Sequence, residues 1–445
     1  MLEERARYRP CMATNCEDVS AAALAQPRPL LREAQRAFQG VSSPDAVIAY
    51  RCGANAASAC ARNSDFFTEP PCAPVRIGCV AKLLTATLAR RAFDDGLLAP
   101  DQDAGDVLGR TEGRALGGVT VRQLLDHSHG LDDSQLEAVP RRADTRIDSA
   151  ALVRALRVAP PLAPPGALYS YGSAGAWLIA ALLERCRGRP YSAQIRDDIL
   201  APLGILEHDS ESTICPATGA AFALDPTDLL RVVAHVALER PNAWPDDRCS
   251  GVYGPVLPLP GWNPLERGVH LGWKYHGRGW FGHQSSWPGA SLFVRAHPRR
   301  ALALVVASRS HSAALVAARV FGTHLPELFD LRPPTGRGAA PSCDDSGAFD
   351  SAGWHAEIRG GELHVQRRGG RTVQASLRHV GGGVSFTRPA VDSFPHLELF
   401  ARGESVYLWN GRFVLRRNDA VGQSRPNASS TFPGVPTNPA FPAVT

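Results

Sequence analysis

Residues 75–86 constrain the chain most strongly, because an apolar helical repeat begins there directly after a glycine. Apolar residues recur at the spacing of one helix face, while charged residues fall on the other faces. The apolar positions are Val80, Leu83, Leu84, Leu88 and Leu97, and the charged positions are Arg90, Arg91, Asp94 and Asp95. The pattern predicts a helix that starts close to Cys79 and stops at Gly96.

A cysteine and a lysine stand three residues apart at the start of this predicted helix. On a helix Cys79 and Lys82 share one face, so the sulfur and the amine can approach each other. A thiol at a helix N-terminus beside an ammonium group is activated as a nucleophile for acyl chemistry. The alternative is a structural thiol beside a solvated lysine, and the spacing alone does not separate the two interpretations.

The length of 445 residues allows one large domain and a smaller one. A hydrophobic content of 44% and a charged content of 20% are ordinary for a globular protein. The net charge of +5 is small and the arginines are scattered, so we expect no nucleic-acid partner. No apolar run reaches membrane-spanning length. Residues 1–7 are charged without a following apolar segment, which predicts a cytoplasmic location.

The ten cysteines contain no C-x-x-C pair and no zinc-like spacing. In a reducing compartment we expect free thiols. In an oxidising one the N-terminal group could pair, and that group is Cys11, Cys16, Cys52, Cys60 and Cys72. His127 and His129 form an H-x-H pair, but no third ligand accompanies them, so the sequence predicts no metal and no cofactor.

The segment V-R-I-G-C-V-A-K-L-L-T-A at 75–86 resembles the active-site segment of the serine β-lactamase and penicillin-binding-protein superfamily, which carries Ser-x-x-Lys on a helix. The form typical of its esterase and class C-like branch is R-I-G-S-V-x-K-x-x-T-A. Every one of these positions matches except the serine, which is Cys79 here. The departure therefore falls on the nucleophile itself.

Two further segments resemble the same family. Residues 119–131 are similar to I-T-I-R-x-L-L-x-H-T-S-G-L, with Thr120 as a predicted N-cap. Residues 164–177 are similar to P-G-x-x-F-x-Y-S-N-x-G-Y. Matching the glycines places Tyr171 on the family's catalytic tyrosine and Ser173 on its asparagine, with Tyr169 as the second candidate for the tyrosine.

The third motif is Gly282-His283-Gln284-Ser285-Ser286, where the family has Lys-Thr-Gly or His-x-Gly on an edge strand. His283 takes the first motif position and Ser285 replaces the glycine. The resemblance implies an oxyanion hole made by the backbone N–H groups of Cys79 and Ser286. It also implies that His283 holds a carboxylate or another polar group of the substrate.

The resemblance covers about residues 45–330 and implies an α+β, β-lactamase-like fold, in which helices flank an antiparallel sheet beside an all-helical subdomain. We expect an N-terminal arm (1–40), the catalytic domain (41–330), a turn-rich linker (331–345), a small antiparallel, lipocalin-like β domain (346–420) and a disordered tail (421–445). The Pro-, Gly- and Trp-rich stretch from Cys249 to Trp273 is expected to be a substrate-facing loop.

Cysteine in place of serine changes the expected acyl-enzyme from an ester to a thioester, and thioesters are open to attack by amines. We therefore expect an acyltransferase of specialised metabolism, such as antibiotic biosynthesis, that passes an acyl group to an amine or alcohol. Ser173 in place of the family asparagine argues against an ordinary β-lactam substrate. The expected partners are a small-molecule ester, thioester or amide donor, a nucleophilic acceptor and, as a further candidate, a carrier protein.

Two alternatives remain at this point. One is a hydrolase (an esterase, a peptidase or a β-lactamase-like enzyme) that uses the same residues. The other is a non-catalytic binding protein in which the exchange at Cys79 marks a lost activity. A serine enzyme whose nucleophile was exchanged deliberately would show the same pattern.

Overall fold

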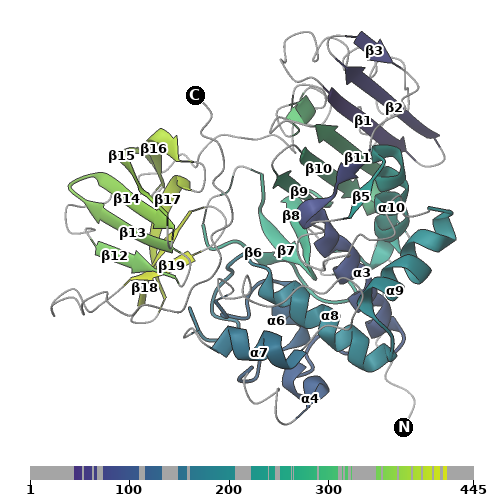
Figure 1. Ribbon diagram of the computed structural model, residues 1–445, viewed down its shortest axis with the longest axis horizontal. Coiled ribbons are helices and arrows are strands. Elements are labelled where there is room, and N and C mark those ends of the chain that lie inside the picture. The colour runs from purple at the N-terminus through teal and green to yellow at the C-terminus, as the bar shows by residue number, and fades with distance from the viewer. Residues whose placement is uncertain are drawn as a thin grey trace.

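The computed structural model shows two parts, one with helices packed on a sheet and one that is a small barrel (Figure 1). The described residues are 45–52, 55–62, 65–67, 74–109, 116–132, 149–157, 161–205, 222–238, 240–245, 251–261, 263, 265–287, 290–308, 313, 316–318, 322, 347–351, 354–367, 370–381, 384–391, 394–402, 405–410 and 414–417.

The larger part is built on an antiparallel sheet whose described strands follow the order β3-β2-β1-β11-β10-β9-β8-β7-β6. Their bounds are β1 (Asp45–Cys52), β2 (Asn55–Arg62), β3 (Asp65–Phe67), β6 (Leu257–Pro258), β7 (Gly268–His270), β8 (Trp273–Gly277), β9 (Trp280–Trp287), β10 (Ala290–His297) and β11 (Leu302–Ser308). Strand β1 pairs with β11 so that Ile48 lies opposite Val306. The sheet thus joins chain segments that lie more than 200 residues apart.

The helix predicted at the first motif is α3 (Ala81–Asp94), and the 3-10 turn η1 (Gly78–Val80) leads directly into it. Gly78 has φ +53°, a conformation that a residue with a Cβ adopts only with strain. The chain then leaves the helix through Gly96 at φ +69°, as the sequence indicates. Nearly every residue of α3 is buried, because α8, α9 and β8 all pack against it.

The remaining helices surround α3 and one face of the sheet. They are α4 (Ala104–Leu108), α6 (Val121–Leu125), α7 (Ser149–Arg157), α8 (Ala174–Arg187), α9 (Tyr191–Ile195), α10 (Pro226–Leu238), the π-helical turn η3 (Arg196–Leu200), and the 3-10 turns η4 (Ala201–Leu203), η5 (Pro241–Ala243) and η6 (Pro298–Arg300). The short strands β4 (Val75–Arg76) and β5 (Ala223–Leu224) pair with each other. Thr120 caps α6 in a capping box with Gln123, so the predicted cap is confirmed.

One hydrophobic core joins the sheet to the helices. Leu292 and Val294 of β10 and Val305 of β11 belong to the same buried cluster as Leu84 of α3 and Val232 of α10. In register, Val294 lies opposite His283 and Leu292 opposite Ser285 of β9. Opposed residues share a face of an antiparallel sheet, so His283 and Ser285 lie on the face that the helices cover.

The smaller part is a closed barrel in which each strand pairs with the next and the last returns to the first. Its strands are β12 (Gly347–Asp350), β13 (Trp354–Arg359), β14 (Glu362–Arg367), β15 (Thr372–Gly381), β16 (Val384–Val391), β17 (Phe394–Arg402), β18 (Ser405–Trp409) and β19 (Val414–Arg417). This up-and-down order of eight described strands is the lipocalin arrangement. Alternate residues such as Leu363 and Val365 fill the interior.

The expected α+β architecture, with helices packed on an antiparallel sheet, is confirmed. Two expectations about strands were wrong. The third motif lies on β9, which is flanked by β8 and β10 and is not an edge strand. The stretch up to Trp273 holds β6 and β7, although loops connect them. The domain boundaries stay predictions, and the arm (1–40), the linker (331–345) and the tail (421–445) fall outside the described residues.

Within the described part of the chain, no helix is both long and apolar enough to cross a membrane.

Candidate active site

The predicted nucleophile lies at the junction of η1 and α3. Cys79 is the middle residue of η1 and is partly exposed. Its backbone N–H donates a hydrogen bond to Oγ of Ser285 over 3.2 Å. Because η1 packs against β9, the first and third motifs meet although 206 residues separate Cys79 and Ser285.

The two other predicted catalytic groups contact each other. Lys82 is only 3% exposed in the first turn of α3, and its Nζ lies 4.8 Å from the centroid of the Tyr171 ring. Tyr171 lies in the loop before α8 and is buried as well. Burying an ammonium group is costly unless an electron-rich partner faces it, and the phenol ring supplies such a partner. The structure therefore brings together Lys82 of the segment 75–86 and Tyr171 of the segment 164–177.

His127 holds the loop that carries Tyr171. Its carbonyl accepts the N–H of Ser170 at 2.8 Å, its Nδ1 accepts the N–H of Gly172 at 3.4 Å, and its ring lies 4.8 Å from the Tyr171 ring. His127 has φ +54°, which costs free energy for a residue with a side chain. Strain retained beside a candidate catalytic tyrosine indicates that the loop needs this geometry.

The two candidate tyrosines have different surroundings. Both pack in one apolar cluster, but Tyr171 also contacts Lys82 and His283, whereas the ring of Tyr169 lies 5.9 Å from that of His127. The geometry therefore favours Tyr171 as the tyrosine of the site.

His283 on β9 is 1% exposed, and its surroundings fix its protonation state. Burial, followed by the charges of Lys274 and Lys82, holds the pKa of His283 well below its ordinary value, so the ring is neutral. Nδ1–H donates to the Gln284 carbonyl at 2.7 Å, which leaves Nε2 as an acceptor 3.4 Å from the Tyr171 hydroxyl. Nε2 can therefore accept a hydrogen bond from the phenol, and the expected contact of His283 with a carboxylate or another polar group of the substrate stays a prediction.

A second lysine lies in the site, although no motif in the sequence indicates it. Nζ of Lys274 on β8 lies 4.6 Å from the centroid of the Tyr171 ring, and Lys274 forms a buried ion pair with Glu266. Glu266 also accepts a hydrogen bond from Gln284 at 2.7 Å, and Gln284 accepts one from Arg295 at 2.9 Å. One signal was available in the sequence, because Lys82 and Lys274 are the only lysines among 48 lysine and arginine residues.

The remaining predicted residues lie around this group. Ser285 is buried on β9 and touches Cys79, while Ser286 is exposed and pairs with Ser291 of β10. Ser173 is the N-cap residue of α8, two positions after Tyr171. One predicted oxyanion donor, the N–H of Cys79, thus has the Ser285 hydroxyl as its acceptor.

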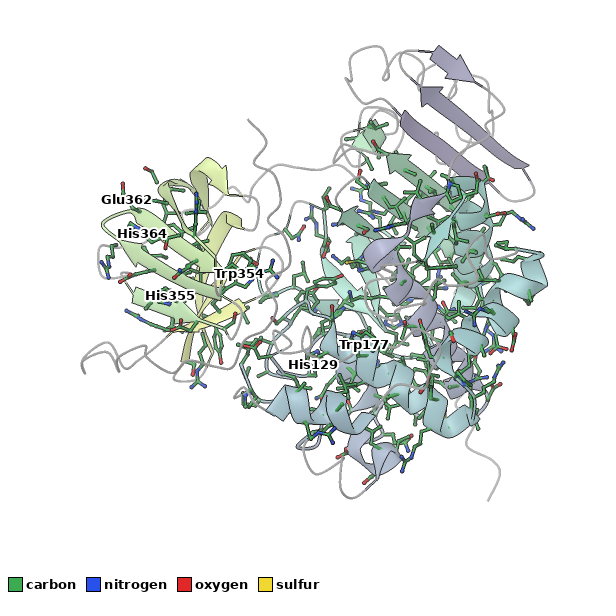
Figure 2. All side chains as sticks on the ribbon, in the orientation of Figure 1. His129, Trp177, Trp354, His355, Glu362 and His364 are labelled. Carbon is green, nitrogen blue, oxygen red and sulfur yellow. The ribbon has the colours of Figure 1, made fainter. Side chains whose placement is uncertain are left out.

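Across the described residues, no three His, Cys, Asp or Glu side chains gather as metal ligands would. In the H-x-H pair, His127 faces Tyr171, while Nδ1 of His129 accepts the N–H of Leu131 at 3.0 Å. Burial lowers the pKa of His129 to about 4. On the barrel, His355, Glu362 and His364 lie on the side away from the helices (Figure 2).

Comparison with known proteins agrees with this geometry. The Beta-lactamase family model matches residues 70–319, which is more than half of the chain. Monacolin J acid methylbutanoyltransferase of Aspergillus terreus is 31% identical over 220 residues, a stretch that covers 42% of this chain and 53% of that protein. The chain thus spans about half the length of this curated relative.

Two solved structures share the fold. SurE with D-Leu has a TM-score of 0.65 at 22% identity, and the match covers 90% of this chain and 99% of the SurE chain. D-amino acid amidase from Ochrobactrum anthropi SV3, complexed with L-phenylalanine, has a TM-score of 0.52 at 18% identity, with coverage of 66% and 97%. With the family model matched over most of the larger part, the chain belongs to the beta-lactamase family and is an enzyme of the beta-lactamase-like superfamily.

Proposed function

We propose that this enzyme is an acyltransferase that forms a thioester on Cys79 and passes the acyl group to an amine or alcohol. The observation that supports it best is the placement of a partly exposed thiol at η1, with Lys82 one turn further on and in contact with Tyr171. A nucleophile with two proton-handling groups is the minimum for covalent acyl transfer. The 31% identical relative is named as an acyltransferase, which agrees with this direction.

The reaction has two balanced steps. In the first, Sγ of Cys79 bonds to the donor's carbonyl carbon, the bond to the leaving group breaks, and the thiol proton passes through Tyr171 and Lys82 to that group. In the second, the acceptor's nitrogen or oxygen attacks the thioester carbon and the carbon–sulfur bond breaks. The acceptor's proton returns through the same residues to the sulfur.

The neutral His283 adds a further proton acceptor to this route. Its Nε2 faces the Tyr171 hydroxyl, so it can accept the phenol's proton briefly when Tyr171 takes one from the acceptor. Because burial and the two lysines disfavour the protonated ring, the proton does not stay on His283. His283 would therefore hold the proton of Tyr171 only briefly, so that Tyr171 can act again in the next reaction cycle.

Hydrolysis is the competing outcome for the same acyl-enzyme. Water and an amine attack the same thioester carbon, and the amidases that share the fold show that this scaffold can serve hydrolysis. A thioester reacts more readily with amines than with water, so the cysteine favours transfer.

Intact-protein mass spectrometry tests the proposal. The chain is incubated with an activated small acyl thioester and then with amino acids of both configurations, and D-leucine is included because SurE binds it. We expect an added acyl mass on the wild type and none on Cys79→Ala. Addition of the acceptor should discharge the adduct faster than buffer does. Adduct loss at the same rate with and without every acceptor would indicate a hydrolase.

Thiol reactivity separates the enzyme from a binding protein. We expect Cys79 to react with iodoacetamide faster than Cys186, because burial raises the pKa of the Cys186 thiol. Cys79→Ala should remove the fast phase, and Lys82→Met should slow it. Equal alkylation rates at both cysteines, without any acyl adduct, would overturn the proposed activity.

A further inference from the structure

Both lysines of this chain lie beside the same side chain, that of Tyr171. Of 48 lysine and arginine residues only Lys82 and Lys274 are lysines, so arginine fills every other cationic position. Both lysines are buried, and their ammonium groups lie 4.8 and 4.6 Å from the centroid of the same ring, that of Tyr171. A chain that otherwise uses arginine has kept lysine at the two positions that face this phenol.

Lysine and arginine differ in the property that matters here. An ammonium group is a compact point charge, whereas a guanidinium spreads its charge over a plane and needs room for a fork of donors. The His127 and His283 rings lie 4.8 and 5.7 Å from the same ring, so the space that is left beside Tyr171 suits two compact ammonium groups better than two planar guanidinium groups. Compact charges can face the phenol while both histidines stay in place.

The neighbours of Lys274 hold its ammonium group against the ring. Glu266 is 4% exposed and pairs with Nζ of Lys274. Gln284 ties Glu266 to Arg295, which is fully buried on β10 and donates to the His283 carbonyl at 3.0 Å. This chain of contacts fixes the position of Lys274 relative to the third motif.

We infer that Lys274 is a positioning residue that acts through Tyr171, lowering the free energy of the phenolate so that Tyr171 can remove a proton near neutral pH. The charged and titratable groups that face Tyr171 in the described contacts are Lys82 on α3, Lys274 on β8, His127 after α6 and His283 on β9. His283 is neutral, so the two ammonium groups dominate the field. The inference rests on the proposed role of Tyr171 as the proton carrier.

The first test is the pH dependence of acyl-enzyme formation. Lys274→Gln should move the acidic limb of the rate profile to higher pH by about one pH unit or more, since the loss of a nearby cation raises an acid's pKa by about 1–3. Lys274→Arg should show a smaller shift in the same direction than Lys274→Gln. Glu266→Gln should move the limb to lower pH, because it leaves the charge of Lys274 uncompensated.

Opposite shifts from the two partners of one ion pair separate an electrostatic role from a structural one. A purely structural pair would lower the rate in both variants without moving the limb, and that result would overturn the inference. If Lys274→Gln does not fold, the double variant Lys274→Met with Glu266→Gln replaces it, because it leaves neither partner of the ion pair as an unpaired buried charge. The acidic limb of its rate profile should also lie at higher pH than that of the wild type.

The second test needs no activity. In Cys79→Ala, tyrosine labelled with ¹³C at Cζ is followed by NMR against pH, and Tyr171→Phe identifies the signal. We expect Tyr171 to titrate at lower pH than free tyrosine, and at higher pH again once Lys274→Gln is added. A titration unaffected by Lys274 would overturn the inference. If acyl transfer is absent but the titration of Tyr171 still responds to Lys274→Gln, the result would count only against the proposed function.

Discussion

At the scale of single residues, the exchange of the third-motif glycine for Ser285 has the clearest consequence. Its hydroxyl oxygen accepts a hydrogen bond from the N–H of Cys79, the group that an oxyanion hole at this position needs. The bound carbonyl oxygen must displace this contact before the N–H can stabilise negative charge. In the proposed reaction, each acylation would therefore start with one of the two predicted oxyanion donors engaged.

We therefore expect Ser285→Gly and Ser285→Ala to raise kcat/KM of acylation about two- to tenfold, which corresponds to the net free energy of one hydrogen bond. Stopped-flow measurement of acyl-enzyme formation checks this. Ser286→Ala, which leaves the backbone N–H in place at an exposed position, serves as the control. Slower acylation in both Ser285 variants would show instead that the hydroxyl itself stabilises the oxyanion.

Asp126 gives a prediction about pH at the same scale. Burial raises the pKa of this carboxyl group to about 7, against the opposing effects of Arg122 and two backbone N–H groups. The ordinary value is 3.8, so between about pH 4 and pH 7 the unfolded chain is ionised here and the folded chain is not. The unfolded state then binds fewer protons, and stability falls as pH rises across this window.

Asp126→Asn removes that dependence. Relative to the wild type, the variant should gain stability progressively from pH 4 to pH 8, by up to about 4 kcal/mol for a difference of three pKa units. Urea unfolding at several pH values measures the gain. Asp106→Asn, at an exposed position in α4, should show no comparable trend. A stability difference that does not vary with pH would contradict the assignment.

At the scale of elements, the packing of α8 against α6 depends on a glycine. A Cβ on Gly175 would lie 2.1 Å from the Leu124 carbonyl oxygen, so the two helices could not keep their separation. Because α8 starts directly after the Tyr171 loop, a shift of the helix also moves the site. The absence of a side chain at Gly175 thus sets the distance between the segment 164–177 and the core.

Gly175→Ala should therefore lower the free energy of unfolding by about 1–3 kcal/mol, the usual cost of overpacking. It should also slow acylation. Gly188→Ala at the other end of α8 is the matched control, because a Cβ there meets nothing within 4 Å and only the left-handed backbone opposes it. Thermal unfolding of both variants gives the comparison, and equal losses would mean that contact with α6 is not the cause.

The elements also show what the sequence could and could not predict. Periodicity and caps were enough for α3 and α6, because these depend on residues close in sequence. Strands β2 and β3 lack the alternating, β-branched pattern of a strand and were missed. Lys274 was missed for a different reason, since its role arises only where β8 passes Tyr171, about 100 residues away in sequence.

At the scale of the whole molecule, the barrel contacts the loop of the candidate active site. Tyr407 of β18 and Val414 of β19 pack in one cluster with Leu168, Tyr169 and Tyr171. The N–H of Val414 also donates to Oγ of Ser170 at 3.3 Å. Figure 1 shows these strands on the side of the barrel toward β6 and β7. The apolar contact should make the two parts unfold together.

Tyr407→Ala tests this coupling. The loss of a buried aromatic ring should lower stability by about 3 kcal/mol and separate one thermal transition into two. Differential scanning calorimetry measures both effects. Val373→Ala, at a half-exposed position on β15, should keep a single transition. Two transitions already present in the wild type would show that the parts unfold independently.

The scarcity of lysine has a consequence for how the protein reacts with activated acyl donors. Activated acyl donors modify free amines on protein surfaces without any catalysis, and arginine, which stays protonated, does not accept them. No lysine stands on the exterior of the described chain, because both amines are enclosed beside a phenol. In the proposed function, the lysine amines of the protein would therefore be shielded from its own acyl donors.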